Sequence, residues 1–254
     1  MAKVFLGVGH GGTDPGAVAN GFLEKDVNLD TALFCAKVLT SHGVQVLLSR
    51  ETDEDDSLEE EIRECNAYNP DLAVDIHHNA GGGKGAEVYF HFGGGVSKTL
   101  AENILSQIVA IGQNSRGEKI KLNENGLDWF GFIRETTAPA VIVECAFLDN
   151  PNDIRMVETI DKREKMGIAI AKGILQTLKI PYQEEPALED VPPVEQQEDT
   201  PPMTKPEETE KPKTEEDPPK ENGLCPKKPS SLSAWIKKVI LTILEILLHF
   251  FQKK

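Results

Sequence analysis

The first 180 residues predict an α/β domain with a mostly parallel twisted sheet flanked by helices. Short apolar runs bounded by turn residues alternate with longer amphipathic stretches, which is the pattern of strands followed by helices. Such alternation is typical of a parallel sheet covered by its crossover helices. The composition changes sharply after Ile180, so this domain is expected to end there.

Five apolar runs are the strand candidates, at residues 4–8, 44–49, 72–77, 86–92 and 140–145. Four amphipathic stretches are the helix candidates, at residues 24–43, 57–69, 96–112 and 153–179. The first helix ends at His42-Gly43, a common helix stop. In the second, Ser57 stands three residues before Glu60, the spacing of a capping box.

Composition excludes some functions and indicates a compartment. The formal charge of -15 argues against a nucleic-acid partner, because binding phosphates requires a basic face. The four cysteines form no C-x-x-C pair, so neither a disulfide framework nor a zinc-thiolate site is indicated. The apolar run at residues 4–8 is too short for a signal-peptide core, which predicts a cytoplasmic protein.

Residues 181–229 are predicted to be a disordered acidic linker. They hold 12 of the 16 prolines, and residues 183–223 carry 14 acids against 4 lysines. Such a segment cannot bury enough apolar surface to offset its ordering entropy.

Residues 230–254 predict an amphipathic helix. Its polar positions recur every three or four residues, at Lys238, Thr242, Glu245, His249 and Gln252. Residues 224–254 carry a charge of +5 and include Trp235, which favours a helix lying in a membrane interface. The same stripe also suits self-association in a helix bundle. Polar residues in the middle of the segment argue against a spanning helix.

Four polar residues are expected to meet at one edge of the sheet. His10 follows the first strand in "VFLGVGHGGTDPGA", His77 lies near the end of the third, and Glu144 near the end of the fifth. Ligands of parallel sheets gather beyond the carboxyl ends of the strands. Glu24 opens the first helix just after the glycine-rich loop, which can return it toward His10.

Two imidazoles and a carboxylate are a complete ligand set for a catalytic zinc, with a fourth position left for water. His10, Glu24 and His77 are therefore interpreted as metal ligands. Glu144 is interpreted as the general base, because its apolar neighbours would desolvate it and raise its pKa. The alternative for Glu144 is a structural salt bridge with Arg134.

The neighbours of His77 receive weaker predictions. Strand alternation points His77 and His78 to opposite faces, so only one of them is expected to bind the metal. His78 is then expected to line a substrate groove or lie at the surface. Asn79 is expected to bind substrate, orient a ligand or hold the loop.

Residues 3–178 resemble the zinc-dependent N-acetylmuramoyl-L-alanine amidases called amidase 3. The matching stretches are "GHGGTDPGA", "EKDVNLDTA", "GVQVLLSRETD", "DIHHNA" and "PAVIVECAFLDNPND". The resemblance implies zinc on His10, Glu24 and His77, with Glu144 as the catalytic glutamate. It also implies cleavage of the amide between N-acetylmuramic acid and L-alanine in peptidoglycan.

This chain departs from the usual Ser-Ile-His-x-Asn motif of the family, because Asp75 takes the serine position. The resemblance and the short N-terminal apolar run together suggest a phage or prophage endolysin, held in the cytoplasm until it reaches the wall. The alternatives are a bacterial sporulation or autolytic amidase, a zinc carboxypeptidase, and a non-catalytic peptidoglycan-binding domain of the same fold.

Overall fold

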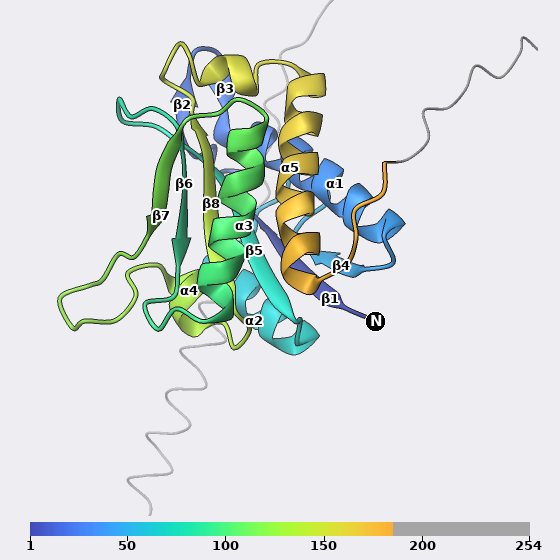
Figure 1. The fold of residues 1–254 in the computed structure, drawn as a ribbon. Helices are drawn as coiled ribbons and strands as arrows, with labels where there is room; N and C mark the ends of the chain where they lie inside the picture. Colours follow the sequence, from blue (N-terminus) through green and yellow to red (C-terminus); the bar gives the residue numbers. More distant parts are fainter. Residues whose placement is uncertain (185–254) are drawn as a thin grey trace, which may run out of the picture. The chain divides into compact units, whose positions relative to one another are not determined.

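The computed structural model describes residues 1–184 (Figure 1). The predicted helix at 230–254 and all but the first four residues of the predicted linker lie outside the described residues. Residues 181–184 form neither helix nor strand. The Tyr182 ring stacks on His42 at 5.2 Å between centroids, and the Gln183 amide donates to His42 Nε2 at 3.0 Å. The chain thus stays against the domain as far as Gln183.

The domain is built on a six-stranded sheet with strand order β4-β1-β5-β8-β6-β7. Its strands are β1 (Lys3–Val8), β4 (Gln45–Leu48), β5 (Leu72–Asn79), β6 (Ala86–Phe90), β7 (Ser115–Lys119) and β8 (Ala140–Phe147). All five predicted strands are present, and the predicted fold class is confirmed. β6 runs antiparallel to β8, and β7 runs parallel to β6, so the last two strands reverse the direction of the other four.

The four predicted helices are also present. They are α1 (Glu24–Ser41), α2 (Leu58–Tyr68), α3 (Val96–Ala110) and α5 (Ile160–Leu178). Ser57 Oγ accepts the Glu60 amide at 3.2 Å, which confirms the predicted cap. Small elements complete the domain: β2 (Val18–Ala19), β3 (Phe22–Leu23), α4 (Gly131–Glu135) and the 3₁₀ turn η1 (Ile154–Met156). Within residues 1–184, no helix is both long and apolar enough to cross a membrane.

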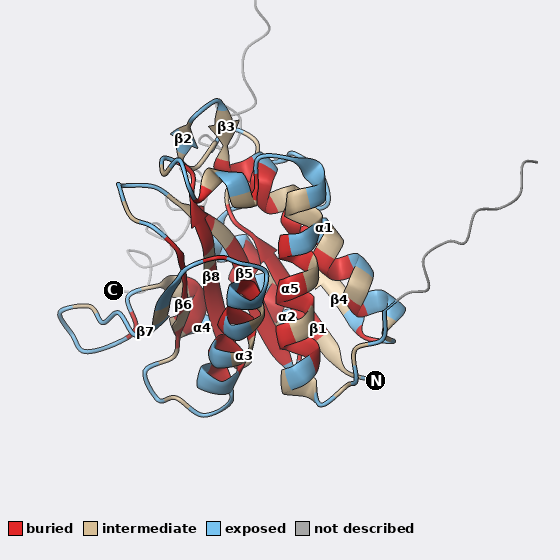
Figure 2. Cartoon of the chain, turned by 45° about the horizontal axis from the view of Figure 1, so that its top comes forward, coloured by how far each residue is buried: buried red, intermediate tan, exposed pale blue. Residues whose placement is uncertain are grey.

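The two faces of the sheet are covered unequally, and this difference positions the site. Helices α1, α3 and α5 cover one face, and the strand residues on that side form the main apolar core with them (Figures 1 and 2). On the other face, α2 and α4 pack over a smaller core that includes Phe5, Ala73 and Phe132. Further along the same strands, toward their carboxyl ends, this second face carries His77 and Glu144, which are neighbours in the register of β5 and β8.

Candidate metal centre

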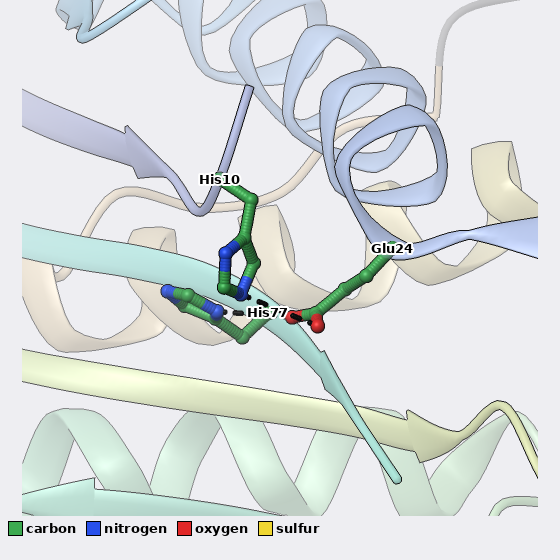
Figure 3. Close-up of side chains that lie close together, drawn as sticks. All are labelled: His10, Glu24 and His77. Atoms are coloured by element: carbon green, nitrogen blue, oxygen red, sulfur yellow. Dashed lines mark hydrogen bonds and ion pairs between the residues drawn. The ribbon is translucent and has the colours of Figure 1, made fainter. Parts of the chain in front are cut away.

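The structure brings His10, Glu24 and His77 together (Figure 3). His10 Nε2 lies 3.3 Å from Glu24 Oε2, and His77 Nδ1 lies 3.0 Å from Glu24 Oε1. One ligand atom from each residue lies within 4.8 Å of the others. Three elements far apart in sequence thus supply one compact donor set: the loop after β1, the start of α1, and β5.

The glycine-rich loop after β1 fixes the orientation of His10. His10 itself has a positive φ of 62°, a conformation that non-glycine residues rarely adopt outside functional or strained sites. Asp14 Oδ2 lies 2.8 Å from His10 Nδ1, so the other ring nitrogen, Nε2, faces Glu24. The hydrogen bond with Glu24 is the largest cause of a raised pKa for His10.

Buried Arg50 stabilises the same loop through hydrogen bonds to its backbone. Its guanidinium donates to the carbonyls of Val8 at 3.1 Å, Gly9 at 3.3 Å and Lys25 at 2.8 Å. It thereby ties the end of β1 to the first turn of α1. Sequence reasoning gave Arg50 no role, although it lies inside the quoted stretch "GVQVLLSRETD".

Glu24 is the first residue of α1 and is 4% exposed. Its Oε2 accepts the Ala17 amide at 2.8 Å, a bond that closes the loop onto the helix. Burial alone raises the pKa of this carboxyl, but the hydrogen bonds with His10 and His77 outweigh burial and hold the pKa far below its usual range. Glu24 is therefore an ionised carboxylate facing two imidazoles.

A second carboxylate holds the far side of the His77 ring. Asp75 Oδ2 lies 3.1 Å from His77 Nε2, while Nδ1 of the same ring faces Glu24. Burial lowers the pKa of His77, but Asp75 and Glu24 outweigh it, so the pKa is raised well above its usual value. A carboxylate on the second nitrogen of a ligating imidazole is a common way to fix the ring and raise its basicity.

Asp75 itself lies against buried Glu61 of α2. Asp75 Oδ1 and Glu61 Oε1 are buried without a hydrogen-bond partner among the described residues. A Cβ on Gly7 would lie 2.1 Å from Glu61 Oε1 and 2.8 Å from Asp75 Oδ1, so both carboxylates occupy the space that this glycine leaves. Burial, and then Asp75, raise the pKa of Glu61 well above its usual value. The acid at the family's usual serine position was the signal for this arrangement.

Glu144 lies on β8 beside His77 in the strand register. Its Oε2 is buried and has no hydrogen-bond partner among residues 1–184. Burial raises the pKa of Glu144 to about 7. Arg134, the salt-bridge partner considered for Glu144, instead pairs with Glu135 at 2.7 Å.

The structure does not bring the His78 side chain to the cluster, although the His78 backbone amide donates to Glu24 Oε1 at 3.1 Å. His78 is 1% exposed, and its Nδ1 lies 2.7 Å from Asn28 Oδ1 on α1, so it faces the opposite side of β5 and reaches neither a groove nor the surface. Burial lowers its pKa to about 3. Asn79 holds the following loop, since its Oδ1 accepts the Ala80 amide at 2.8 Å. Its Nδ2 donates to Glu87 at 3.4 Å.

Two imidazole nitrogens and an ionised carboxylate match the ligand set of a catalytic divalent metal, and a buried glutamate beside them can move protons. Such a cluster, placed on a mixed sheet flanked by helices, is typical of a metal-dependent hydrolase. Residues 4–176 match the Amidase_3 family, described as N-acetylmuramoyl-L-alanine amidase, and the chain belongs to this family.

Relatives and solved structures agree with this family. The chain is 35% identical over 190 residues to the endolysin of Bacillus phage SPP1. This alignment covers 71% of this chain and 68% of the endolysin. The chain is 33% identical over 184 residues to the sporulation-specific N-acetylmuramoyl-L-alanine amidase of Bacillus subtilis, covering 71% and 69%. The catalytic domain of CwlV, an N-acetylmuramoyl-L-alanine amidase from Bacillus (Paenibacillus) polymyxa var. colistinus, superimposes with a TM-score of 0.65 at 29% identity, covering 71% and 100%.

Proposed function

We propose that this chain cleaves the amide between N-acetylmuramic acid and L-alanine in peptidoglycan with a divalent metal, zinc by preference, held by His10, Glu24 and His77. The observation that carries the proposal is the convergence of these three residues beside buried Glu144. A cavity of about 270 Å³ opens next to both imidazoles. The ligand set also suits cobalt or manganese, so zinc rests on ligand type.

A divalent metal in this site supplies water activation and polarisation of the scissile carbonyl. The protein supplies the proton transfers. Burial raises the pKa of Glu144 to about 7 in the metal-free chain. Glu144 accepts a proton from water and delivers it to the leaving amine of L-alanine. Asp14 and Asp75 hold the outer nitrogens of His10 and His77, so both rings keep a fixed orientation during turnover.

The relatives include both a phage endolysin and a sporulation amidase, so both biological settings suit the chain. We propose the endolysin setting, which the 35% identity to a phage endolysin supports. Induced expression together with a membrane-permeabilising agent should then lyse the host culture, and expression alone should not.

We also propose that residues 181–229 are a linker and that residues 230–254 are a membrane or wall anchor. The basic charge and the apolar stripe of the last segment support this role. Sedimentation with anionic vesicles should therefore require residues 230–254. Binding that persists after their removal contradicts the anchor without affecting the amidase reaction.

The amidase proposal is tested by the bond that breaks. Purified peptidoglycan is incubated with the full chain, and newly exposed amino-terminal L-alanine is measured with and without a chelator. The same assay is run with Glu144→Gln, a substitution that keeps the shape of the side chain but removes its proton chemistry. Release that stops in both cases supports the proposal. A different newly exposed amino-terminal residue points to a peptidase, and wall binding without any new amino terminus points to a non-catalytic domain.

A further inference from the structure

A row of charged residues extends from Glu144 across the sheet to its edge. Glu144 on β8 pairs in register with Glu87 on β6, just as it pairs with His77 on the other side. Directly opposed residues on neighbouring strands point to the same face of a sheet. Glu87 therefore projects from the same face as the proposed general base, one strand nearer the edge.

Buried Glu87 forms ion pairs with two cations of edge strand β7, Arg116 and Lys119. It is 3% exposed, and its Oε2 accepts Arg116 Nε at 2.5 Å and also Lys119 Nζ. The Tyr89 hydroxyl donates to Oε1 at 2.9 Å. Burial alone raises the pKa of Glu87, but the bonds from Lys119 and Arg116 outweigh it, so the pKa lies below its usual range. The carboxylate is thus ionised and well bonded.

The two cations stay accessible to a ligand. The side chains of Arg116 and Lys119 are 34% and 31% exposed. Arg116 pairs with Glu87 through Nε and not through its two terminal nitrogens, and its guanidinium rests over the Phe147 ring at 4.9 Å. With two positive charges against one negative, this cluster is locally basic on a chain of net charge -15.

We propose that Arg116 and Lys119 form a subsite that binds a carboxylate of the stem peptide while the scissile amide lies at Glu144. This proposal rests on the proposed function and deepens it by naming the part of the substrate that is recognised. Guanidinium and ammonium groups fixed by a buried carboxylate are preorganised donors for an anion. A stem peptide offers such carboxylates at its acidic residues and at its carboxyl terminus.

A purely structural role for the cluster, pinning β7 to β6, makes a different prediction. A structural pin changes stability and affects all substrates equally. A carboxylate subsite changes the KM of substrates that carry the carboxylate and leaves their amidated counterparts unaffected. The comparison between acid and amide substrates therefore separates the two roles.

The experiment uses the full chain with soluble muramyl peptides in three forms: all carboxylates free, the acidic residue amidated, or the carboxyl terminus amidated. The rate at which amino-terminal L-alanine is exposed gives kcat and KM for each. For the wild type, we expect one of the two amidated substrates to have a KM about tenfold above that of the free acid. The position of the amide in that substrate identifies the carboxylate that binds. Arg116→Gln and Lys119→Gln should each raise KM for the free acid by about fivefold to tenfold, with kcat within about twofold.

Lys98→Gln is the matched control, because Lys98 is an exposed lysine on α3 that pairs with Glu102. It removes the same charge and should leave every KM unchanged. Arg116→Lys should retain part of the acid preference, and a thermal melt shows whether each variant is folded.

Equal wild-type KM values for all three substrates, or a variant that raises all KM values equally, overturn the subsite. The amidase itself then remains supported by the newly exposed amino-terminal L-alanine. If the wild type exposes no amino-terminal L-alanine in any of the three substrates, the proposed function itself is contradicted.

Discussion

His77 Nε2 lies 3.1 Å from Asp75 Oδ2, while Nδ1 of the same ring lies 3.0 Å from Glu24 Oε1. The Asp75 carboxylate therefore fixes the Nε2 side of the ring, and the Glu24 carboxylate lies on the Nδ1 side. This arrangement presents Nδ1 to the proposed metal. It also makes Asp75 a positioning residue, because it acts on the proposed metal through the His77 ring.

Replacing Asp75 should weaken metal binding. Asp75→Asn and Asp75→Ser, the latter restoring the family's usual residue, should each lower zinc affinity by about 10-fold to 100-fold, because His77 loses its charged partner. Zinc titration of the chelator-stripped protein against a competing dye measures this directly. Glu102→Gln, an exposed acid on α3, is the control and should bind zinc like the wild type. Unchanged affinity in both Asp75 variants contradicts the positioning role.

Gly16 should be required beside the metal centre. It has a φ of +63°, and a Cβ there would lie 2.5 Å from His10 Cδ2 and 2.7 Å from Glu24 Oε2. Gly16→Ala should therefore lower zinc affinity by at least about tenfold by displacing two ligands. Gly43→Ala is the matched control, because Gly43 has a similar φ of +76° but open space around it. That control should cost only about 1 kcal/mol of stability and keep zinc affinity intact.

The hydrogen bonds of the Arg50 guanidinium should stabilise the fold beyond what a positive charge at this position provides. Its three guanidinium nitrogens all donate to backbone carbonyls, whereas a lysine presents only one nitrogen. Arg50→Lys should cost about 2–4 kcal/mol in urea unfolding, because buried carbonyls lose their partners. Arg63→Lys, at an exposed position, should stay within about 0.5 kcal/mol of the wild type. Equal small losses in both variants would show that the loop is held by other contacts.

Glu144 should give the metal-free protein a pH-dependent stability. Burial raises its pKa from 4.5 to about 7, so the folded protein holds a proton through that window that the unfolded chain has released. The wild type should therefore lose stability relative to Glu144→Gln as pH rises from about 5 to about 8, by up to about 3 kcal/mol. Urea unfolding in chelator at the two pH values measures the difference. If the unfolding free energies of the wild type and Glu144→Gln change equally with pH, the Glu144 carboxyl is not buried without a compensating partner.

The apolar patterns predicted most of the fold, and the exceptions have physical causes. β7 reads "SRGEK" and carries no apolar run, because it is an edge strand whose side chains serve ion pairs instead of a core. The reversal of β6 depends on pairing with β8, a contact between distant segments that local pattern does not encode. The amphipathic pattern predicted the last helix from residue 153, but a 3₁₀ turn occupies Ile154–Met156 and α5 begins at Ile160.

The candidate site was predictable where residue type and strand position coincide, as for His10 and His77. Alternation also separated His77 from His78 correctly. Glu61 and Arg50 were missed because their roles depend on burial against other elements. Arg50 lies just after the end of β4, but its bonds to the carbonyls of Val8 and Lys25 join segments that are distant in sequence. Only the unusual acid at position 75 hinted at the carboxylate pair behind His77.

The most direct test of the account is to locate the metal itself. Crystals of the full chain, purified without chelator, are measured at the zinc absorption edge, and an anomalous difference map is calculated. We predict one strong peak bonded to His10 Nε2, the Glu24 carboxylate and His77 Nδ1. A peak ligated by His78, or an empty cluster in a preparation that still exposes amino-terminal L-alanine in peptidoglycan, contradicts the proposed metal centre.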